Sequence, residues 1–258
     1  MDDVSTVPNT ALVTGAGVRV GRALALALAS RGRRVAVHFN RSAEPAEAVV
    51  EDIRKAGGEA AAVHADLAAE AGIAQLIDRA ADALGDPIGC LVNNASVFED
   101  DGVETMTQAS WDLHMAVNLR APIKLIQDFA GQEGGALSGV AVNIVDQRVL
   151  KPTPQFLSYT ASKAALYAMT RTLAQALAPR IRVNAIGPGP TLRNKRQSEE
   201  DWRKQNAATI LGTGSEPEDI AGALLYLLDA KAVTGQMIAV DGGQHLVWQT
   251  PDVYGLTE

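Results

Sequence analysis

The amino-acid sequence predicts a single α/β domain: a doubly wound parallel sheet of seven strands with helices on both faces. Short apolar runs rich in valine alternate with stretches of helical length rich in alanine and leucine, which is typical of repeated strand–helix–strand units. Glycines stand where the expected helices end. The 258 residues are 47% hydrophobic and 21% charged, so the chain has enough apolar material for one large core.

The expected elements follow this alternation along the chain. We expect strands over residues 11–14, 35–39, 60–64, 90–93, 140–145, 182–186 and 236–240. We expect helices over residues 21–30, 44–56, 70–84, 111–130, 159–177 and 217–228. The first three helices are followed by residues that tolerate positive φ, namely Gly32, Gly57 with Gly58, and Gly85. No linker or repeat interrupts the pattern, so residues 1–258 should form one domain, with the polar segment 191–211 as a candidate substrate lid.

The charge balance narrows the possible partners. There are 23 basic and 30 acidic side chains, a net charge of −7, so no overall positive field attracts nucleic acid or an anionic membrane. The start of the chain lacks a basic secretory signal, and no apolar run reaches the ~18 residues of a membrane span, so we expect a cytoplasmic protein. Cys90 is the only cysteine and should lie in a buried strand. The four histidines have neither paired spacing nor cysteine neighbours, so we expect no metal site.

A glycine-rich turn follows the first expected strand, at residues 14–21 (TGAGVRVG). Glycines permit a tight turn there and bring backbone N–H groups towards a pyrophosphate, as in a Rossmann fold. A glycine-rich turn alone is also compatible with a plain strand-to-helix connector. The residues expected to contact the cofactor are Gly15, Gly17, Arg19, Val20 and Gly21.

The end of the second expected strand predicts NADPH rather than NADH. Folds that prefer NAD usually place an acid here, on the ribose 2′-hydroxyl, whereas this chain has Asn40, Arg41 and Ser42. Their guanidinium, hydroxyl and amide groups suit a 2′-phosphate, and an ordinary solvated arginine is the alternative for Arg41. After the third strand come Asp66 and Leu67, also expected at the cofactor; Asp66 either accepts from the adenine amino group or caps the next helix.

Tyr159 and Lys163 lie one helical turn apart on the same face of an expected helix. An ammonium group stabilises a nearby phenolate, so we expect Lys163 to lower the pKa of Tyr159 towards the range useful for a general acid. This spacing also occurs by chance in many helices. Here it accompanies the glycine turn, Asn118 and the segment Gly187-Pro188-Gly189.

Together these residues resemble the short-chain dehydrogenase/reductase family, over nearly the whole chain from the glycine turn to Asp241-Gly242-Gly243. The resemblance implies that Tyr159 donates a proton, that Lys163 binds the nicotinamide ribose and tunes the tyrosine, and that Asn118 holds a water in a proton relay. It adds to the expected cofactor contacts Asn94, Ala95, Ser96, Tyr159, Lys163, Pro188 and Gly189.

The resemblance also implies a homotetramer. Two expected helices support it, because they carry more apolar residues than one core face needs: Leu113, Val117, Leu125, Ile126 and Phe129 in one, and Leu166, Met169, Leu173 and Leu177 in the other.

Two departures from the family pattern point to pteridine and dihydromonapterin reductases, which share both. Arg19 replaces a glycine of the turn, and Asp146 stands where the catalytic serine is usual. An ionised carboxylate accepts hydrogen bonds but donates none, which suits a pterin with N–H donors better than a simple ketone. The residues expected to be catalytic are therefore Asp146, Tyr159, Lys163 and Asn118.

The run from Asn94 to Phe98 resembles the pteridine reductase stretch whose phenylalanine stacks the pterin against nicotinamide. Core packing is the alternative for Phe98, and a local turn bond is the alternative for Ser96 and Arg19. The expected substrate contacts are Arg19, Ser96, Phe98, Asp146 and Tyr159. The function predicted is NADPH-dependent reduction of a pterin. The alternatives are a carbonyl or 3-oxoacyl reductase on the same scaffold, and a non-catalytic sensor that binds NADPH.

Overall fold

All seven expected strands lie parallel in one sheet, in the order β3-β2-β1-β4-β5-β6-β7. The computed structural model describes residues 7–132, 139–194 and 196–250. The strands are β1 (Thr10–Val13), β2 (Arg34–Phe39), β3 (Ala60–His64), β4 (Cys90–Asn93), β5 (Gly139–Ile144), β6 (Ile181–Pro188) and β7 (Met237–Val240). The strand order changes direction between β1 and β4, which creates the crevice where doubly wound folds bind their ligands. The predicted doubly wound Rossmann sheet is confirmed.

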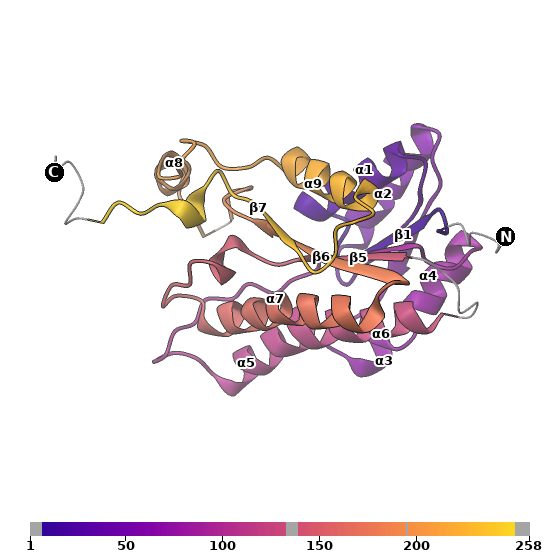
Figure 1. The fold of residues 1–258 in the computed structure, drawn as a ribbon, viewed down its shortest axis with the longest axis horizontal. Coiled ribbons are helices and arrows are strands. Elements are labelled where there is room, and N and C mark those ends of the chain that lie inside the picture. Colours follow the sequence, from indigo (N-terminus) through magenta and orange to yellow (C-terminus); the bar gives the residue numbers. More distant parts are fainter. Residues whose placement is uncertain (1–6, 133–138, 195, 251–258) are drawn as a thin grey trace.

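Helices form a layer on each face of the sheet, as expected. One layer consists of α1 (Arg19–Ser30), α2 (Ala43–Lys55) and α9 (Pro217–Asp229). The other contains α4 (Leu76–Leu84), α6 (Ala121–Gly131) and α7 (Leu157–Leu177). Figure 1 shows the first layer above the sheet, and α6 and α7 below it.

Successive residues of a strand pack into opposite layers. In β1, Ala11 and Val13 contact the layer of α1 and α2, whereas Leu12 contacts the layer of α4 and α6. The strands are therefore covered on both faces, which explains why they read as continuous apolar runs. Cys90 in β4 is fully buried, and burial raises the pKa of its thiol to about 11.

The expected helix 70–84 is divided into α3 (Glu70–Ile73) and α4. Gly72 packs closely on the preceding loop, where a Cβ atom would lie 2.4 Å from the carbonyl oxygen of Asp66. The close approach requires glycine, and glycine is a poor helix former. The prediction of one continuous helix is wrong: Gly72 lies within α3, and the helix is interrupted at Ala74 and Gln75, where Gln75 has φ −117° and ψ 3°.

The expected helix 111–130 starts earlier than predicted, and a π-helical turn interrupts its α-helical hydrogen bonding. It begins with α5 (Gln108–Met115), because Thr107 Oγ1 accepts from the N–H of Ser110 (3.1 Å) and caps it. A π-helical turn, η1 (Ala116–Arg120), connects α5 to α6. Pro122 has no N–H to donate to the carbonyl of Asn118, so regular α-helical bonding fails at this point.

The polar segment 191–211 contains a helix that we did not expect, α8 (Glu199–Ala207). Ser198 Oγ accepts from the N–H of Asp201 (3.0 Å), and three acidic residues occupy the first turn, where they suit the helix dipole. The helix has no buried residue, so the sequence lacks the apolar period that marks the other helices. In Figure 1 it lies outside both helical layers.

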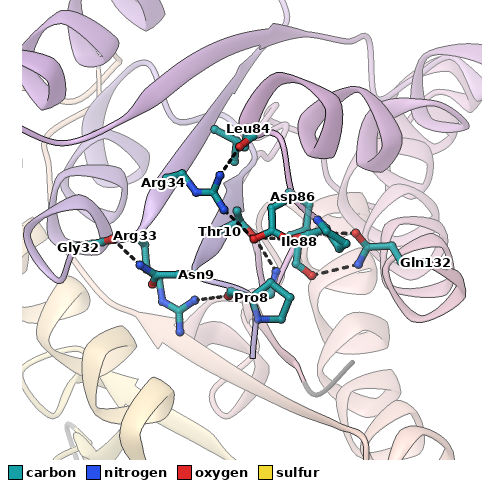
Figure 2. A network of polar contacts seen from close by, with 12 residues as sticks. Pro8, Asn9, Thr10, Gly32, Arg33, Arg34, Leu84, Asp86, Ile88 and Gln132 are labelled. Carbon is teal, nitrogen blue, oxygen red and sulfur yellow. Dashed lines mark hydrogen bonds and ion pairs between the residues drawn. The ribbon is translucent and has the colours of Figure 1, made fainter. Parts of the chain in front are cut away.

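A polar network joins the amino ends of the strands, opposite the carboxyl edge (Figure 2). Arg34, the first residue of β2, donates to the carbonyl of Leu84 (2.5 Å) and pairs with Asp86 (2.6 Å). Gln132 exchanges two hydrogen bonds with the backbone of Ile88, just before β4. These contacts fix the strand starts and face away from the expected ligand crevice.

The apolar residues expected to form surplus faces belong mostly to the core. In the first of the two helices Val117, Leu125, Ile126 and Phe129 are buried, and Leu113 is 38% exposed. In α7, Leu166 is buried. The argument for a tetramer from surplus apolar faces is therefore wrong for these five buried residues, whereas Leu113 is exposed and Met169, Leu173 and Leu177 are half-buried. Over the described parts of the chain no helix is long and apolar enough to cross a membrane.

Candidate active site

The backbone between β1 and α1 has the shape of a phosphate cradle. Gly15 has φ +63°, a left-handed conformation that favours glycine. A Cβ atom at Gly21 would lie 2.2 Å from the carbonyl oxygen of Gly15, so the helix start requires glycine. The N–H groups of the first helical turn, which begins at Arg19, have no acceptor within the helix. The turn therefore fits the pyrophosphate of a dinucleotide.

Arg19 keeps the backbone that a glycine would have, with φ +54°. Its guanidinium donates to the carbonyls of Leu192 (2.9 Å) and Arg193 (3.2 Å). The side chain thus links the phosphate turn to the segment after β6. We expected Arg19 to contact the cofactor and the substrate, with a local turn bond as the alternative. The structure instead shows these two backbone carbonyls, far along the chain, as its partners.

Thr14 and Asn94 connect the turn to the end of β4. Thr14 Oγ1 accepts from the N–H groups of Asn94 (2.9 Å) and Ala95 (3.0 Å). The side-chain amide of Asn94 donates to the carbonyls of Thr14 (2.8 Å) and Gly15 (3.2 Å). Asn94 and Ala95, expected at the cofactor, therefore also brace the turn.

The residues expected to recognise NADPH gather after β2 and β3. Arg41 is exposed and Ser42 is half-buried at the start of α2. Asp66 Oδ1 accepts from the N–H of Ala68 (2.9 Å) and from the amide of Asn40 (3.2 Å), so it orders the loop before α3. The side chain of Leu67 lies in the core, which leaves only its backbone to face a ligand. Val20 likewise packs against the core.

Asp146 and Tyr159 form the centre of the site. The hydroxyl of Tyr159 donates to Asp146 Oδ2 at 2.8 Å, and Asp146 Oδ1 accepts from the N–H of Arg148 at 2.8 Å. The hydrogen bond from Arg148 comes from its backbone N–H and not from its guanidinium. One carboxylate oxygen therefore caps a turn and the other faces the tyrosine.

Burial dominates the ionisation of these groups. It raises the pKa of Asp146, against the opposing effects of the Arg148 N–H and the Tyr159 hydroxyl. Burial, followed by the charge of Asp146, raises the pKa of Tyr159 well above its usual value. The expectation that Lys163 lowers the pKa of the tyrosine is wrong here, since the ammonium lies 5.8 Å from the ring centre and donates to the carbonyl of Ile144 (2.8 Å). Burial lowers the pKa of Lys163 itself to about 8.

Asn118 lies fully buried in the π-helical turn, and its side chain is saturated. Its Oδ1 accepts from the N–H of Val97 (2.8 Å) and the hydroxyl of Ser96 (3.2 Å). Its Nδ2 donates to the carbonyl of Val97 (2.9 Å) and to Ser162 Oγ (3.1 Å). The side chain therefore fixes the loop after β4 against α7, and all of its hydrogen-bonding groups already have protein partners, so the relay water expected at Asn118 stays a prediction. Ser96 Oγ also donates to the carbonyl of Val97 (3.3 Å), which is the local bond weighed as the alternative for Ser96.

Phe98 lines the substrate side of the site. Its ring stacks on that of Phe156, with the ring centroids 4.3 Å apart. It meets the ring of Tyr159 edge-on, with the centroids 4.6 Å apart. Arg196, from the segment before α8, donates to the carbonyl of Phe98 (2.8 Å) and lies over its ring. Phe98 is thus held beside the tyrosine and is only half-buried. We missed Phe156 and Arg196, because neither lies in a recognisable motif.

Asp101 is a further residue that sequence reasoning missed. Its carbonyl accepts from the N–H of Leu157 (3.1 Å), and Oδ1 accepts from the N–H of Ser158 (3.0 Å). These are the first two N–H groups of α7, and Phe156 before them offers no side-chain cap. Asp101 therefore caps the helix that carries Tyr159. The two positions are distant in the sequence, so no local signal reveals the contact.

Pro188 and Gly189 complete the edge at the end of β6. A Cβ atom at Gly189 would lie 2.5 Å from that of Asp241, and the N–H of Gly189 donates to the carbonyl of Val240 (3.0 Å). Glycine is therefore required here for close packing on the end of β7. The cofactor contacts expected of this pair stay a prediction.

Comparisons with known proteins identify the family of this chain. The family model described as short chain dehydrogenase matches residues 9–204. A structure of FolM alternative dihydrofolate reductase 1 from Brucella suis, in complex with NADP, is 47% identical with a TM-score of 0.91, covering 97% of this chain and 100% of that chain. The same protein from Brucella canis, complexed with NADP, is 46% identical with a TM-score of 0.89, covering 97% and 99%.

Curated relatives include a 3-oxoacyl-[acyl-carrier-protein] reductase FabG from Staphylococcus epidermidis, which is 34% identical over 92% of this chain and 99% of its own length. The family match covers most of the sequence, including the cradle and the Asp146–Tyr159 pair. The chain belongs to the short chain dehydrogenase family.

Proposed function

We propose that this protein is an NADPH-dependent oxidoreductase that reduces a dihydropterin, with Tyr159 as the proton donor. The observation that carries the proposal is the 2.8 Å hydrogen bond from Tyr159 to a carboxylate, Asp146, at a position where the family usually has serine. The 46–47% identity with two structures of FolM alternative dihydrofolate reductase, both with NADP, supports the substrate class and the cofactor.

When bound, NADPH supplies a hydride to the carbon of a ring C=N bond. The nitrogen of that bond needs a proton, and the Tyr159 hydroxyl is the donor in the site. Asp146 accepts the hydrogen bond of this hydroxyl and, in its protonated form, restores the proton that Tyr159 gives up. Lys163, on the same helical face, is expected to bind the nicotinamide ribose, and Phe98 offers a flat partner for the pterin ring. Gly15, Gly17 and the first turn of α1 would hold the pyrophosphate, and Arg41 with Ser42 the 2′-phosphate.

A carbonyl or 3-oxoacyl reductase is the second candidate, supported by the FabG relatives. That chemistry uses a neutral hydroxyl next to the tyrosine to donate to a carbonyl oxygen. At Asp146 both carboxylate oxygens already accept hydrogen bonds, and in its ionised form this side chain has no hydroxyl to donate. A sensor without turnover is less consistent with Tyr159, Lys163 and Asn118 all being present. The pterin proposal therefore fits this pair of residues best.

Oxidation of NADPH should be assayed with dihydromonapterin, dihydrobiopterin, dihydrofolate, simple ketones and a 3-oxoacyl thioester. We expect turnover of at least one dihydropterin. Asp146→Ser should lower that turnover by ~10²-fold or more, the low end for a positioned proton-transfer group, and Tyr159→Phe should remove most of it while retaining NADPH binding. Reduction of ketones or 3-oxoacyl thioesters alone by the native protein would refute the pterin assignment and leave the carbonyl reductase.

We further propose that residues 191–211 cover the substrate and that the protein is a homotetramer. Support for the lid comes from its anchors on both sides of the site. Arg19 holds the carbonyls of Leu192 and Arg193, and Arg196 holds the carbonyl of Phe98. The tetramer follows from the family resemblance.

A further inference from the structure

His38 is a buried histidine that the proposed chemistry does not use. It is the next-to-last residue of β2 and is 1% exposed. Its Nδ1 lies 3.0 Å from the backbone N of Gly15, and its Nε2 lies 3.1 Å from the carbonyl oxygen of Ala65. The ring therefore bridges the segments that follow β1 and β3, the neighbours of β2 on either side.

These two contacts settle the protonation of the ring. The N–H of Gly15 is a donor, so Nδ1 must be the unprotonated nitrogen. The carbonyl of Ala65 is an acceptor, so Nε2 carries the proton. A doubly protonated ring would point an N–H at the N–H of Gly15, and burial accordingly lowers the pKa of His38 to about 4.

His38 also determines which turn amides face the cofactor. Its carbonyl accepts from the N–H of Ala16 (2.9 Å), so one residue holds two successive N–H groups of the turn. The donors that follow, at the start of α1, have no acceptor within the helix. On its other side the ring holds Ala65, which precedes Asp66 at the expected adenine end.

We propose that His38 is a positioning residue for the cofactor: its neutral ring fixes the phosphate turn against the adenine-side loop and so determines the affinity for NADPH. The inference rests on the proposed use of NADPH and not on the identity of the substrate. His38 acts through Gly15 and Ala65, and it has no part in proton transfer.

Two near-isosteric variants separate the two contacts. Asparagine in place of histidine puts an amide oxygen near the position of Nδ1, and glutamine puts an amide nitrogen near that of Nε2. His38→Asn therefore retains an acceptor for Gly15, whereas His38→Gln retains only the donor to Ala65. His64→Gln is the matched control, since His64 is an exposed histidine at the same edge.

The dissociation constant of NADP⁺ should be measured by calorimetry, together with KM for NADPH and kcat. Native protein should first bind NADP⁺ more tightly than NAD⁺. The opposite result would contradict the proposed use of NADPH rather than the proposed role of His38. We expect His38→Gln to weaken NADP⁺ roughly three- to tenfold, the effect of one neutral hydrogen bond, and His38→Asn to weaken it less than twofold. The change should appear in KM for NADPH rather than in kcat. Equal weakening in both variants, or none in either, would overturn the role of the ring.

A measurement on the native protein tests the inference even if the variants do not fold. Nitrogen-15 NMR of the histidine rings should show His38 protonated at Nε2 and neutral at pH 5.5. A ring protonated at Nδ1 has no acceptor for Gly15 and would contradict the proposal.

Discussion

Asp146 divides its two oxygens between structure and chemistry. One accepts the N–H of Arg148 and orders the turn after β5, and the other accepts the hydroxyl of Tyr159. A serine at this position would keep a hydroxyl near Tyr159 but has no second oxygen for the turn. The carboxylate therefore fixes the geometry of the site as well as its proton balance.

The raised pKa of Asp146 predicts how the reaction depends on pH. A carboxyl with a raised pKa keeps its proton to higher pH, and its ionisation makes Tyr159 a weaker acid because the negative charge raises the pKa of the tyrosine. We therefore expect kcat for pterin reduction to fall as the pH rises through the Asp146 pKa. A pH–rate profile at saturating NADPH measures this fall. Asp146→Ser should lack that limb, and an identical limb in the variant would assign it to another group.

Arg41 provides a test of the preference for NADPH. Arg41→Ala removes the guanidinium expected on the 2′-phosphate, a charge-assisted contact worth ~1.5–3 kcal/mol. We expect the dissociation constant of NADPH to rise roughly ten- to a hundredfold, and that of NADH to change little. Fluorescence titration with both nucleotides measures the ratio. An equal loss for both cofactors would mean that Arg41 does not contact the phosphate.

Residues in local motifs were predictable, and residues that act across the chain were not. Tyr159, Lys163 and Asp146 have a fixed spacing, and the structure brings them together. Asp101 and His38 carry no such signal, because their partners lie on other elements. The prediction of a lowered pKa for Tyr159 was also wrong. Burial raises this pKa, and the ammonium of Lys163 donates to the carbonyl of Ile144 instead of to the tyrosine.

At the scale of the elements, the start of α7 depends on a distant loop. Phe156 before it has φ +57°, a strained conformation for a bulky residue, and the first N–H groups of the helix bind Asp101. The same loop holds Phe98, which stacks on Phe156. The loop after β4 therefore holds both the stacked pair Phe98–Phe156 and the start of α7, which carries Tyr159.

Asp101→Ala should therefore disturb both stability and chemistry. It leaves the N–H of Ser158 and the hydroxyl of Ser110 without their acceptor, which costs about 1–3 kcal/mol. We expect a lower urea midpoint and a lower kcat, because Tyr159 lies in the first turn of the helix. Asp101→Asn keeps an amide oxygen for Ser158 and should recover most of both. No difference between the two variants would show that the side-chain acceptor is unimportant.

The sequence predicted which elements exist better than it predicted how they are joined. The strands follow from apolar runs that are buried on both faces. The π-helical turn at Asn118 depends on Pro122, and the break between α3 and α4 lies at Ala74 and Gln75. A hydrophobic period reveals neither feature. The polar helix α8 contributes nothing to the core, so the pattern that marks the other helices is missing.

The amino edge of the sheet provides a test of stability without chemistry. Arg34→Ala removes the pair with Asp86 and the bond to Leu84, both partly buried. We expect a loss of about 1–2 kcal/mol in the free energy of unfolding. The kcat of the folded protein should not change, which thermal denaturation and steady-state kinetics together measure. A large fall in kcat would mean that the two edges are coupled.

At the scale of the whole molecule, we expect a homotetramer. Trp111 and Leu113 on α5 are 36% and 38% exposed and offer an apolar surface for a partner. Twofold interfaces are the commonest way to cover such patches, and two of them give a tetramer. Light scattering at micromolar concentration measures the mass. A stable monomer of 27.1 kDa would contradict this expectation.

The network of Arg34 and the site of Tyr159 lie at opposite ends of the same strands. Six residues of β2 span about 20 Å, and substitutions farther apart than ~10 Å usually have additive effects. In such a sheet, mutations at the amino edge can raise the stability without altering the site, and mutations at the carboxyl edge can change the substrate. The presence of reductases with different substrates among the relatives is what this separation would allow.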